Sequence, residues 1–191
     1  MLPGPRPGLG LPLLAALVRA DVGAGALADV VITVTAGVLP AALLGFATSI
    51  RLLEQERGSP GLLLLWMFCA TWASDSAAYY VGRSLGRHPM APRVSPKKTW
   101  EGAAGGVAGA IVVSVAYKTL VLPGASLADA LAVGAVVALL GPAGDLAESV
   151  LKRSAGVKDS GALFPGHGGI LDRVDSLLLT LPVLYYYYRL A

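Results

Sequence analysis

Long apolar stretches separated by short polar connections dominate this chain. Residues 30–50 form a run of 21 residues without a charge. At ~1.5 Å per residue, a helix of that length crosses the hydrocarbon core of a bilayer. Four more apolar stretches follow, and residues 9–20 form a short stretch suited to a short or interfacial helix. We expect the four later helices at residues 58–74 (continuing to 82), 102–117 (reaching 123), 127–144, and 170 or 174 to 188.

The composition agrees with a membrane protein. Apolar residues make up 55% of the chain and charged residues only 14%, well below the roughly 25% of soluble domains. The apolar runs are continuous and lack the alternation of barrel strands. We therefore predict an all-α, polytopic membrane bundle of about five transmembrane helices plus the short N-terminal helix, in a single domain over residues 1–191. A soluble protein with an unusually apolar core is the alternative.

The basic residues gather in two connections, residues 83–98 and 153–169. By the positive-inside rule both face the cytoplasm, which puts the N-terminus inside and the C-terminus outside. We expect an integral membrane protein of a bacterial-type inner membrane, in contact with membrane lipid. The net charge of +3 is too small to indicate nucleic acid, and the single cysteine, Cys69, excludes an intramolecular disulfide.

Acidic residues inside apolar stretches tend to be functional, because a charge at the bilayer centre costs ~2.5–3.5 kcal/mol. The first such group is Asp75-Ser76-Ala77-Ala78-Tyr79. Asp75 and Tyr79 are four residues apart and share a helix face. A helix-end acid paired with Arg83 is the simpler interpretation of Asp75.

The second group is the connection from Ser95 to Gly102. Lys97 and Lys98 stand just before the third predicted helix, where two ammonium groups can meet a polyanion. Thr99 is a suitable N-cap for that helix, and Glu101 is favoured in its first turn. Ordinary topology and attraction to anionic headgroups explain the two lysines equally well.

The third group, residues 144–176, joins two acidic helix faces through a basic, glycine-rich connection. If the fourth helix continues past Gly144, one of its faces carries Asp145, Glu148, Ser149 and Lys152. Another face, at the start of the fifth helix, carries Asp172, Asp175 and Ser176.

This arrangement suits phosphate chemistry. Mg²⁺ prefers carboxylate oxygens and is usually held by one or two of them together with substrate phosphates. The glycines of residues 166–169 let backbone N–H groups approach a phosphate beside a helix N-terminus. Basic side chains can neutralise charge in phosphoryl transfer. Taken singly, His167 is also compatible with a plain loop residue, and the glycines with turns.

The third group resembles the signature of the phosphatidate cytidylyltransferases, also called CDP-diacylglycerol synthases. The resemblance runs without a gap over 27 residues and rests on Ser149, Lys152, Arg153, Lys158, Asp159, Gly161, Pro165, Gly166, His167, Gly168, Gly169, Asp172, Arg173 and Asp175. The first two groups resemble further blocks of the family in the same order. The resemblance covers residues 61–191, whereas residues 1–60 read as generic apolar helices. Family members usually carry more N-terminal membrane helices.

The resemblance implies a Mg²⁺-dependent reaction of CTP with phosphatidate that releases pyrophosphate and forms CDP-diacylglycerol. Asp145 and Asp172 are the expected metal ligands, a second, monovalent cation is compatible with the pattern, and a homodimer is compatible with the sequence. The expected catalytic residues are Asp145, Asp172, Lys152, Arg173 and His167. The expected substrate-binding residues are Asp75, Ser76, Tyr79, Ser95, Lys97, Lys98, Glu148, Ser149, Arg153, Lys158, Asp159, Gly168, Gly169 and Asp175.

Two alternatives stay open. The same nucleotide chemistry on an isoprenoid ether-lipid phosphate needs the same motif and differs only in the apolar walls. A degenerate, non-enzymatic membrane homologue is the other. The presence of Asp75, Asp145, Asp172 and Asp175 favours an enzyme, because a degenerate site tends to lose its acids.

Overall fold

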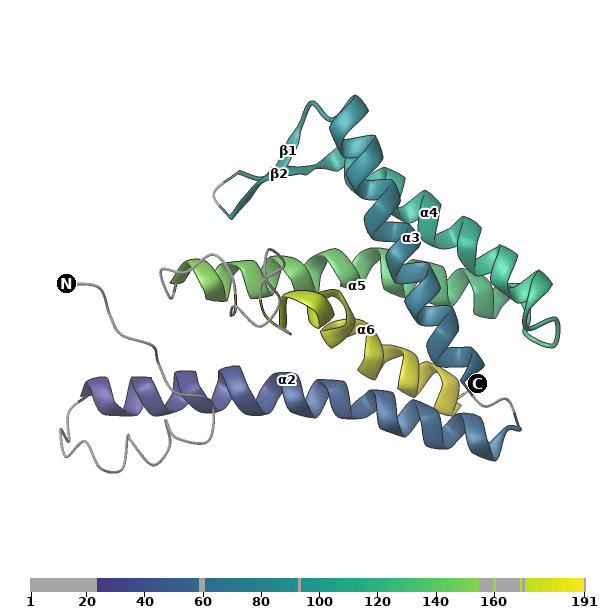
Figure 1. Ribbon diagram of the computed structural model, residues 1–191, viewed down its shortest axis with the longest axis horizontal. Coiled ribbons are helices and arrows are strands. Elements are labelled where there is room, and N and C mark those ends of the chain that lie inside the picture. Colours follow the sequence, from purple (N-terminus) through teal and green to yellow (C-terminus); the bar gives the residue numbers. More distant parts are fainter. Residues whose placement is uncertain are drawn as a thin grey trace. The chain divides into compact units, whose positions relative to one another are not determined.

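The computed structural model describes residues 24–58, 61–92, 94–154, 160, 169 and 171–190. Its elements, labelled as in Figure 1, are α2 (Ala24–Glu56), α3 (Leu62–Leu85), β1 (Pro89–Ala91), β2 (Ser95–Thr99), α4 (Trp100–Leu120), α5 (Leu127–Ser154) and α6 (Leu171–Leu190). The chain divides into two compact units, Met1–Leu43 and Leu44–Ala191. In the first unit the structure describes the N-terminal part of α2. Everything below concerns the second.

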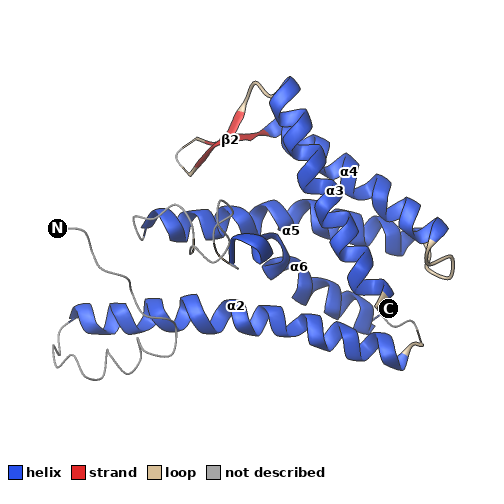
Figure 2. Cartoon of the chain, in the orientation of Figure 1, coloured by secondary structure: helices blue, strands red, loops and turns tan. Residues whose placement is uncertain are grey.

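The five long apolar stretches are helical, as the hydrophobic pattern predicts, and the chain is mostly helix (Figure 2). Within the described residues, α4 and the Leu127–Arg153 part of α5 are long and apolar enough to cross a membrane. Helix α3 carries Asp75 and Arg83, and α6 carries Asp172 and Asp175, which lower the mean hydropathy of these helices. The five-span topology stays a prediction, and residues 9–20 lie outside the described residues.

The connection between α3 and α4 differs from the all-α expectation. Its strands β1 and β2 pair antiparallel, with Pro89 opposite Thr99 and Ala91 opposite Ser95. Strands of three and five residues are too short to show an alternating pattern in the sequence. Thr99 caps α4 as predicted, because its Oγ1 accepts a hydrogen bond from the Gly102 N–H at 3.1 Å.

Helices α3 and α4 lie side by side because glycines of α4 leave room for small residues of α3 (Figure 1). A Cβ at Gly109 would lie 2.7 Å from the Cβ of Ala77, and one at Gly105 would lie 2.6 Å from that of Val81. This four-residue glycine spacing allows the close backbone approach typical of membrane helix pairs. This close packing fixes the position of α3 relative to α4 and so to the hairpin that joins them.

The buried core lies toward the start of α3 and the end of α4. Trp66 and Tyr117 are buried and stack with ring centroids 5.4 Å apart. The Tyr117 hydroxyl donates a hydrogen bond to the Leu62 carbonyl oxygen at 2.8 Å. Leu53 of α2 and Leu184 of α6 belong to the same core. The opposite ends of α3 and α4 hold the hairpin and a pocket.

Candidate active site

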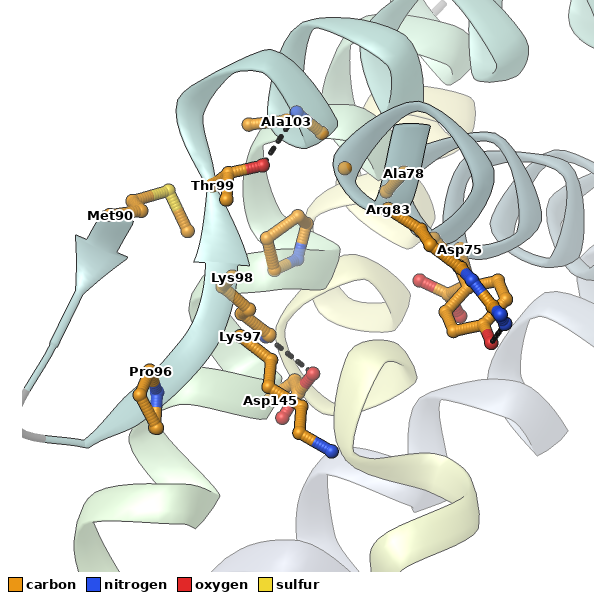
Figure 3. Close-up of a pocket in the computed structure, with 14 residues that line it drawn as sticks. Asp75, Ala78, Arg83, Met90, Pro96, Lys97, Lys98, Thr99, Ala103 and Asp145 are labelled. Carbon is orange, nitrogen blue, oxygen red and sulfur yellow. Dashed lines mark hydrogen bonds and ion pairs between the residues drawn. The ribbon is translucent and has the colours of Figure 1, made fainter. Parts of the chain in front are cut away.

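A pocket of about 740 Å³ lies between α3, the hairpin, the first turn of α4 and α5 (Figure 3). All three polar groups found in the sequence contribute residues to it. Its lining residues are Asp75, Ala78, Tyr79, Gly82, Arg83, Met90, Pro96, Lys97, Lys98, Thr99, Gly102, Ala103, Pro142 and Asp145. Basic, acidic and apolar side chains therefore share one cavity.

Helix α3 supplies the first wall from a single face. Asp75 and Tyr79 both line the pocket, as their four-residue spacing predicts. Arg83 also lines it and donates a hydrogen bond from Nη1 to the Tyr79 hydroxyl at 3.0 Å. The described contacts thus pair Arg83 with Tyr79, whereas the simpler interpretation paired it with Asp75. Ser76 is exposed on the same helix and is not among the lining residues.

The hairpin supplies the second wall and brings both lysines to the pocket. Lys97 is exposed at its edge, and Lys98 forms an ion pair with Asp145 of α5, as Figure 3 shows. The side chains of Lys98 and Asp145 retain 25% and 33% of their exposure, so solvent and ligands can reach both. Ser95 begins β2 and is partly buried outside the lining.

Three carboxylates approach one another from three helices. Asp75 of α3, Asp145 of α5 and Asp175 of α6 lie close enough to repel each other, and Lys98 is a nearby positive charge. Gly144 makes this approach feasible, because a Cβ there would run into the backbone carbonyl of Asp175. A cation at this point would relieve the repulsion between the carboxylates.

A second polar cluster centres on Lys152 of α5. Its Nζ donates to Glu148 Oε2 at 2.9 Å and to Asp172 Oδ1 at 2.5 Å. Glu148 and Lys152 sit on the helix face that the sequence predicted, and Ser149 donates to Asp145 Oδ1 at 3.4 Å from the same face. Of these residues, Asp145 also lines the pocket.

Asp172 bonds to the glycine-rich connection at two points, Ser160 and Gly169. Its Oδ2 accepts hydrogen bonds from the Ser160 N–H at 2.9 Å, the Ser160 hydroxyl at 2.6 Å and the Gly169 N–H at 2.7 Å. With Lys152 on Oδ1, both oxygens of this carboxylate are engaged. Ser160 was not predicted as a site residue, because nothing in its sequence surroundings marks it as a partner of Asp172.

Several predicted residues fall partly or wholly outside this description. His167, Gly168, Lys158 and Asp159 lie outside the described residues. Arg173 is placed only by its position in the first turn of α6. Arg153 is exposed near the end of α5, and Gly169 is buried. The sequence also missed the apolar part of the pocket, Met90, Pro96, Ala103 and Pro142, since isolated apolar residues carry no signal in an apolar chain.

The available donors fit a magnesium ion whose coordination is completed by substrate phosphates. Among the described residues, no group of three or more His, Cys, Asp or Glu side chains is arranged as a protein-only metal cage. Mg²⁺ rarely needs one, since one or two carboxylates plus substrate phosphates usually hold it. Asp145 lines the pocket and offers carboxylate oxygens there, whereas Asp172 offers the same type of donor but already binds Lys152 and Ser160.

Comparison with known proteins decides the family. The model of the cytidylyltransferase family matches residues 11–191. The chain belongs to this family. The match begins upstream of residue 61, so it includes α2, which the motifs alone left unassigned.

Named members of the cytidylyltransferase family match over most of the chain. The chain is 41% identical to a phosphatidate cytidylyltransferase of Haemophilus influenzae over 130 residues, 66% of this chain and 45% of that protein. It is 44% identical to one of Brucella suis over 140 residues, 73% of this chain and 51% of that protein. A third, from Bacillus subtilis, is 43% identical over 127 residues, 66% of this chain and 47% of that protein. The chain thus spans about half the length of these relatives.

Proposed function

We propose that this protein transfers CMP from CTP to phosphatidate, giving CDP-diacylglycerol and pyrophosphate. The observation that carries the proposal is the pocket, which the basic Lys97 and Lys98 line together with the acidic Asp75 and Asp145. Relatives named phosphatidate cytidylyltransferase share 41–44% of the aligned residues with this chain, which supports the same substrates.

The reaction needs no protein nucleophile. A phosphate oxygen of phosphatidate attacks the α-phosphorus of CTP, the bond from that phosphorus to the bridging oxygen breaks, and pyrophosphate leaves with the bond's electron pair. Catalysis then rests on positioning and on charge stabilisation. Lys97 and Lys98 hold phosphates at the pocket, and Lys152, Arg153 and Arg173 do so from α5 and α6.

The remaining predicted residues support this chemistry. Asp75, Glu148 and Asp175 orient the basic groups, and Tyr79 orients Arg83 through its hydroxyl. In the glycine-rich connection, Lys158 and His167 would supply side-chain donors to phosphate and Gly168 a backbone donor, with Asp159 and Gly169 beside them.

Asp145 and Asp172 would hold the Mg²⁺, which supplies charge neutralisation between the reacting phosphates. Asp145 lines the pocket directly. Asp172 is not among the lining residues, and to hold the metal its Oδ1 would have to give up the Lys152 Nζ contact at 2.5 Å. A monovalent cation beside Mg²⁺ stays compatible with the surplus of carboxylates.

We place the protein in a bacterial-type inner membrane with the pocket toward the cytoplasm, where CTP is found. The two candidate spans support this placement, as do exposed apolar side chains such as Trp72, Val112 and Leu139. An ordered set of five spans and a homodimer are parts of the same proposal.

One reconstitution tests the function and its two rivals. The purified protein in detergent or vesicles is incubated with CTP, Mg²⁺ and either ester-linked phosphatidate or an ether-linked isoprenoid analogue, and pyrophosphate and CDP-lipid are measured together. Stoichiometric formation of both products from the ester lipid is expected. Faster turnover of the ether lipid would favour the other acceptor. No product from either lipid, while the Bacillus subtilis relative is active in parallel, would favour a non-enzymatic homologue.

A further inference from the structure

The hairpin between α3 and α4 is too small to hold its own shape. Strands β1 and β2 pair through Pro89 with Thr99 and Ala91 with Ser95, and the register is irregular between these pairs. An isolated two-stranded hairpin is marginally stable at best in water. Its position must therefore be fixed by contacts at its base.

The carboxylate of Glu101, in the first turn of α4, makes those contacts. Its Oε2 accepts hydrogen bonds from the N–H groups of Arg87 at 3.1 Å and His88 at 3.2 Å. Its Oε1 lies 2.5 Å from His88 Nδ1. The Trp100 N–H donates in turn to the His88 carbonyl oxygen at 3.0 Å. Residues 87–88, where the chain leaves α3 and enters β1, are thus attached to the start of α4.

The attached hairpin forms one side of the pocket. It contributes Met90, Pro96, Lys97, Lys98 and Thr99 to the lining. Lys98 extends from β2 to Asp145 on α5, as Figure 3 shows. A shift of the hairpin base would therefore move Lys98 relative to Asp145. The Glu101 side chain itself is absent from the lining residues, so it acts on the pocket through the hairpin.

We propose that Glu101 is a positioning residue that anchors the hairpin and so places Lys98 for phosphate binding. The proposal rests on the proposed function for its catalytic consequence, but the anchoring itself is independent of the reaction. Glu101 differs in this from an acid that merely favours a helix start, because its carboxylate bonds to residues 13 and 14 positions away.

Activity measurements on four variants test the catalytic part. Glu101→Ala is expected to lower kcat/KM about 10- to 100-fold, the usual effect of removing a group that orients a site residue. Glu101→Gln keeps an oxygen that can accept both backbone N–H groups, so it should retain most of the activity. Arg87→Ala is the matched control, because it leaves the Arg87 N–H in place. If Glu101 acts through Lys98, the double variant Glu101→Ala with Lys98→Ala should have a kcat/KM no more than about threefold below that of Lys98→Ala alone.

A spin label measures the anchoring without any turnover. Val94, whose N–H bonds to the Ala91 carbonyl at the hairpin turn, is replaced by cysteine in a Cys69→Ala background and labelled with a nitroxide. Glu101→Ala should make the hairpin more mobile and so narrow the lines of the electron paramagnetic resonance spectrum. Glu101→Gln and Arg87→Ala should leave that spectrum unchanged. The melting temperature should stay constant, since the core lies at the other ends of α3 and α4.

The outcomes separate the two proposals. An unchanged spectrum in Glu101→Ala overturns the anchoring. If Glu101→Ala increases the mobility of the label but the double variant shows the product of the two single-variant losses in kcat/KM, then Glu101 does not act through Lys98. If the unaltered protein makes no CDP-lipid, the proposed function fails, and the spectra still decide whether Glu101 holds the hairpin.

Discussion

Glu54, near the end of α2, stabilises the start of α3, and we expect its replacement to lower the stability of the protein. The side chain is fully buried. Its carboxylate accepts hydrogen bonds from the N–H groups of Gly61 at 3.0 Å, Leu63 at 2.5 Å and Leu64 at 2.9 Å. Gly61 is the N-cap and has no side chain to do this. Glu54 therefore satisfies donors that every helix leaves open in its first turn.

The magnitude follows from these contacts. Each stranded buried donor is worth about 1–3 kcal/mol, and Arg51 Nη1, at 3.3 Å from Oε2, also loses its partner. Water can reach the partly exposed Gly61 and Arg51, so we expect Glu54→Ala to cost about 3–5 kcal/mol, mainly from the stranded N–H groups of Leu63 and Leu64. At about 2–4 °C per kcal/mol for a chain of this size, the melting temperature falls by about 6–20 °C.

Thermal unfolding in detergent, followed by circular dichroism, measures this effect. Glu56→Ala is the matched control, since Glu56 is 67% exposed and faces Arg189 only at 3.7 Å. Glu54→Gln keeps one acceptor oxygen, so its melting temperature should lie between those of Glu54→Ala and Glu56→Ala. If Glu54→Ala melted within about 2 °C of the control, the helix-capping role would be refuted.

The remaining predictions concern charges and topology. Lys97→Ala should raise the apparent KM for phosphatidate and leave kcat nearly unchanged, because Lys97 is exposed at the pocket edge; steady-state kinetics at two salt concentrations would show this. Arg173→Ala should lower kcat/KM chiefly through kcat, and an unchanged kcat would remove it from the site. A cysteine at Ser154, in a cysteine-free variant, should react with a membrane-impermeant reagent from the cytoplasmic side, and labelling only from outside would refute the topology.

The sequence predicted the helices well because each long apolar run satisfies its backbone internally. The continuation of α5 past Gly144 was predictable too, since Asp145, Glu148, Ser149 and Lys152 fit one helix face. The hairpin was not, because its pairing depends on residues that meet only when α3 and α4 pack. Glu101 was predicted only as an acid of the first turn of α4, which is confirmed, and Glu54 was not singled out. Their N–H partners come from separate elements, and no periodicity records such a contact.

The two proposed metal ligands differ in what holds them, and this difference is testable. Asp145 contacts the side chains of Lys98 and Ser149, which can rearrange around a ligand. Asp172 accepts from two backbone N–H groups as well as from Lys152 and the Ser160 hydroxyl. An asparagine at 172 would place an NH₂ group against one of these donors, whereas an asparagine at 145 meets no backbone donor among the described contacts.

Asp145→Asn should therefore lower turnover about 10²-fold or more while the melting temperature stays unchanged. Asp172→Asn should lower both, because losing the carboxylate also weakens the hydrogen bonds to Ser160 and Gly169 of the glycine-rich connection, at a cost of about 1–3 kcal/mol. Turnover and thermal unfolding measured on the same preparations distinguish the two variants. Equal melting temperatures for both would mean that Asp172 does not hold the connection. Normal turnover of both with Mg²⁺ would mean that the metal binds elsewhere.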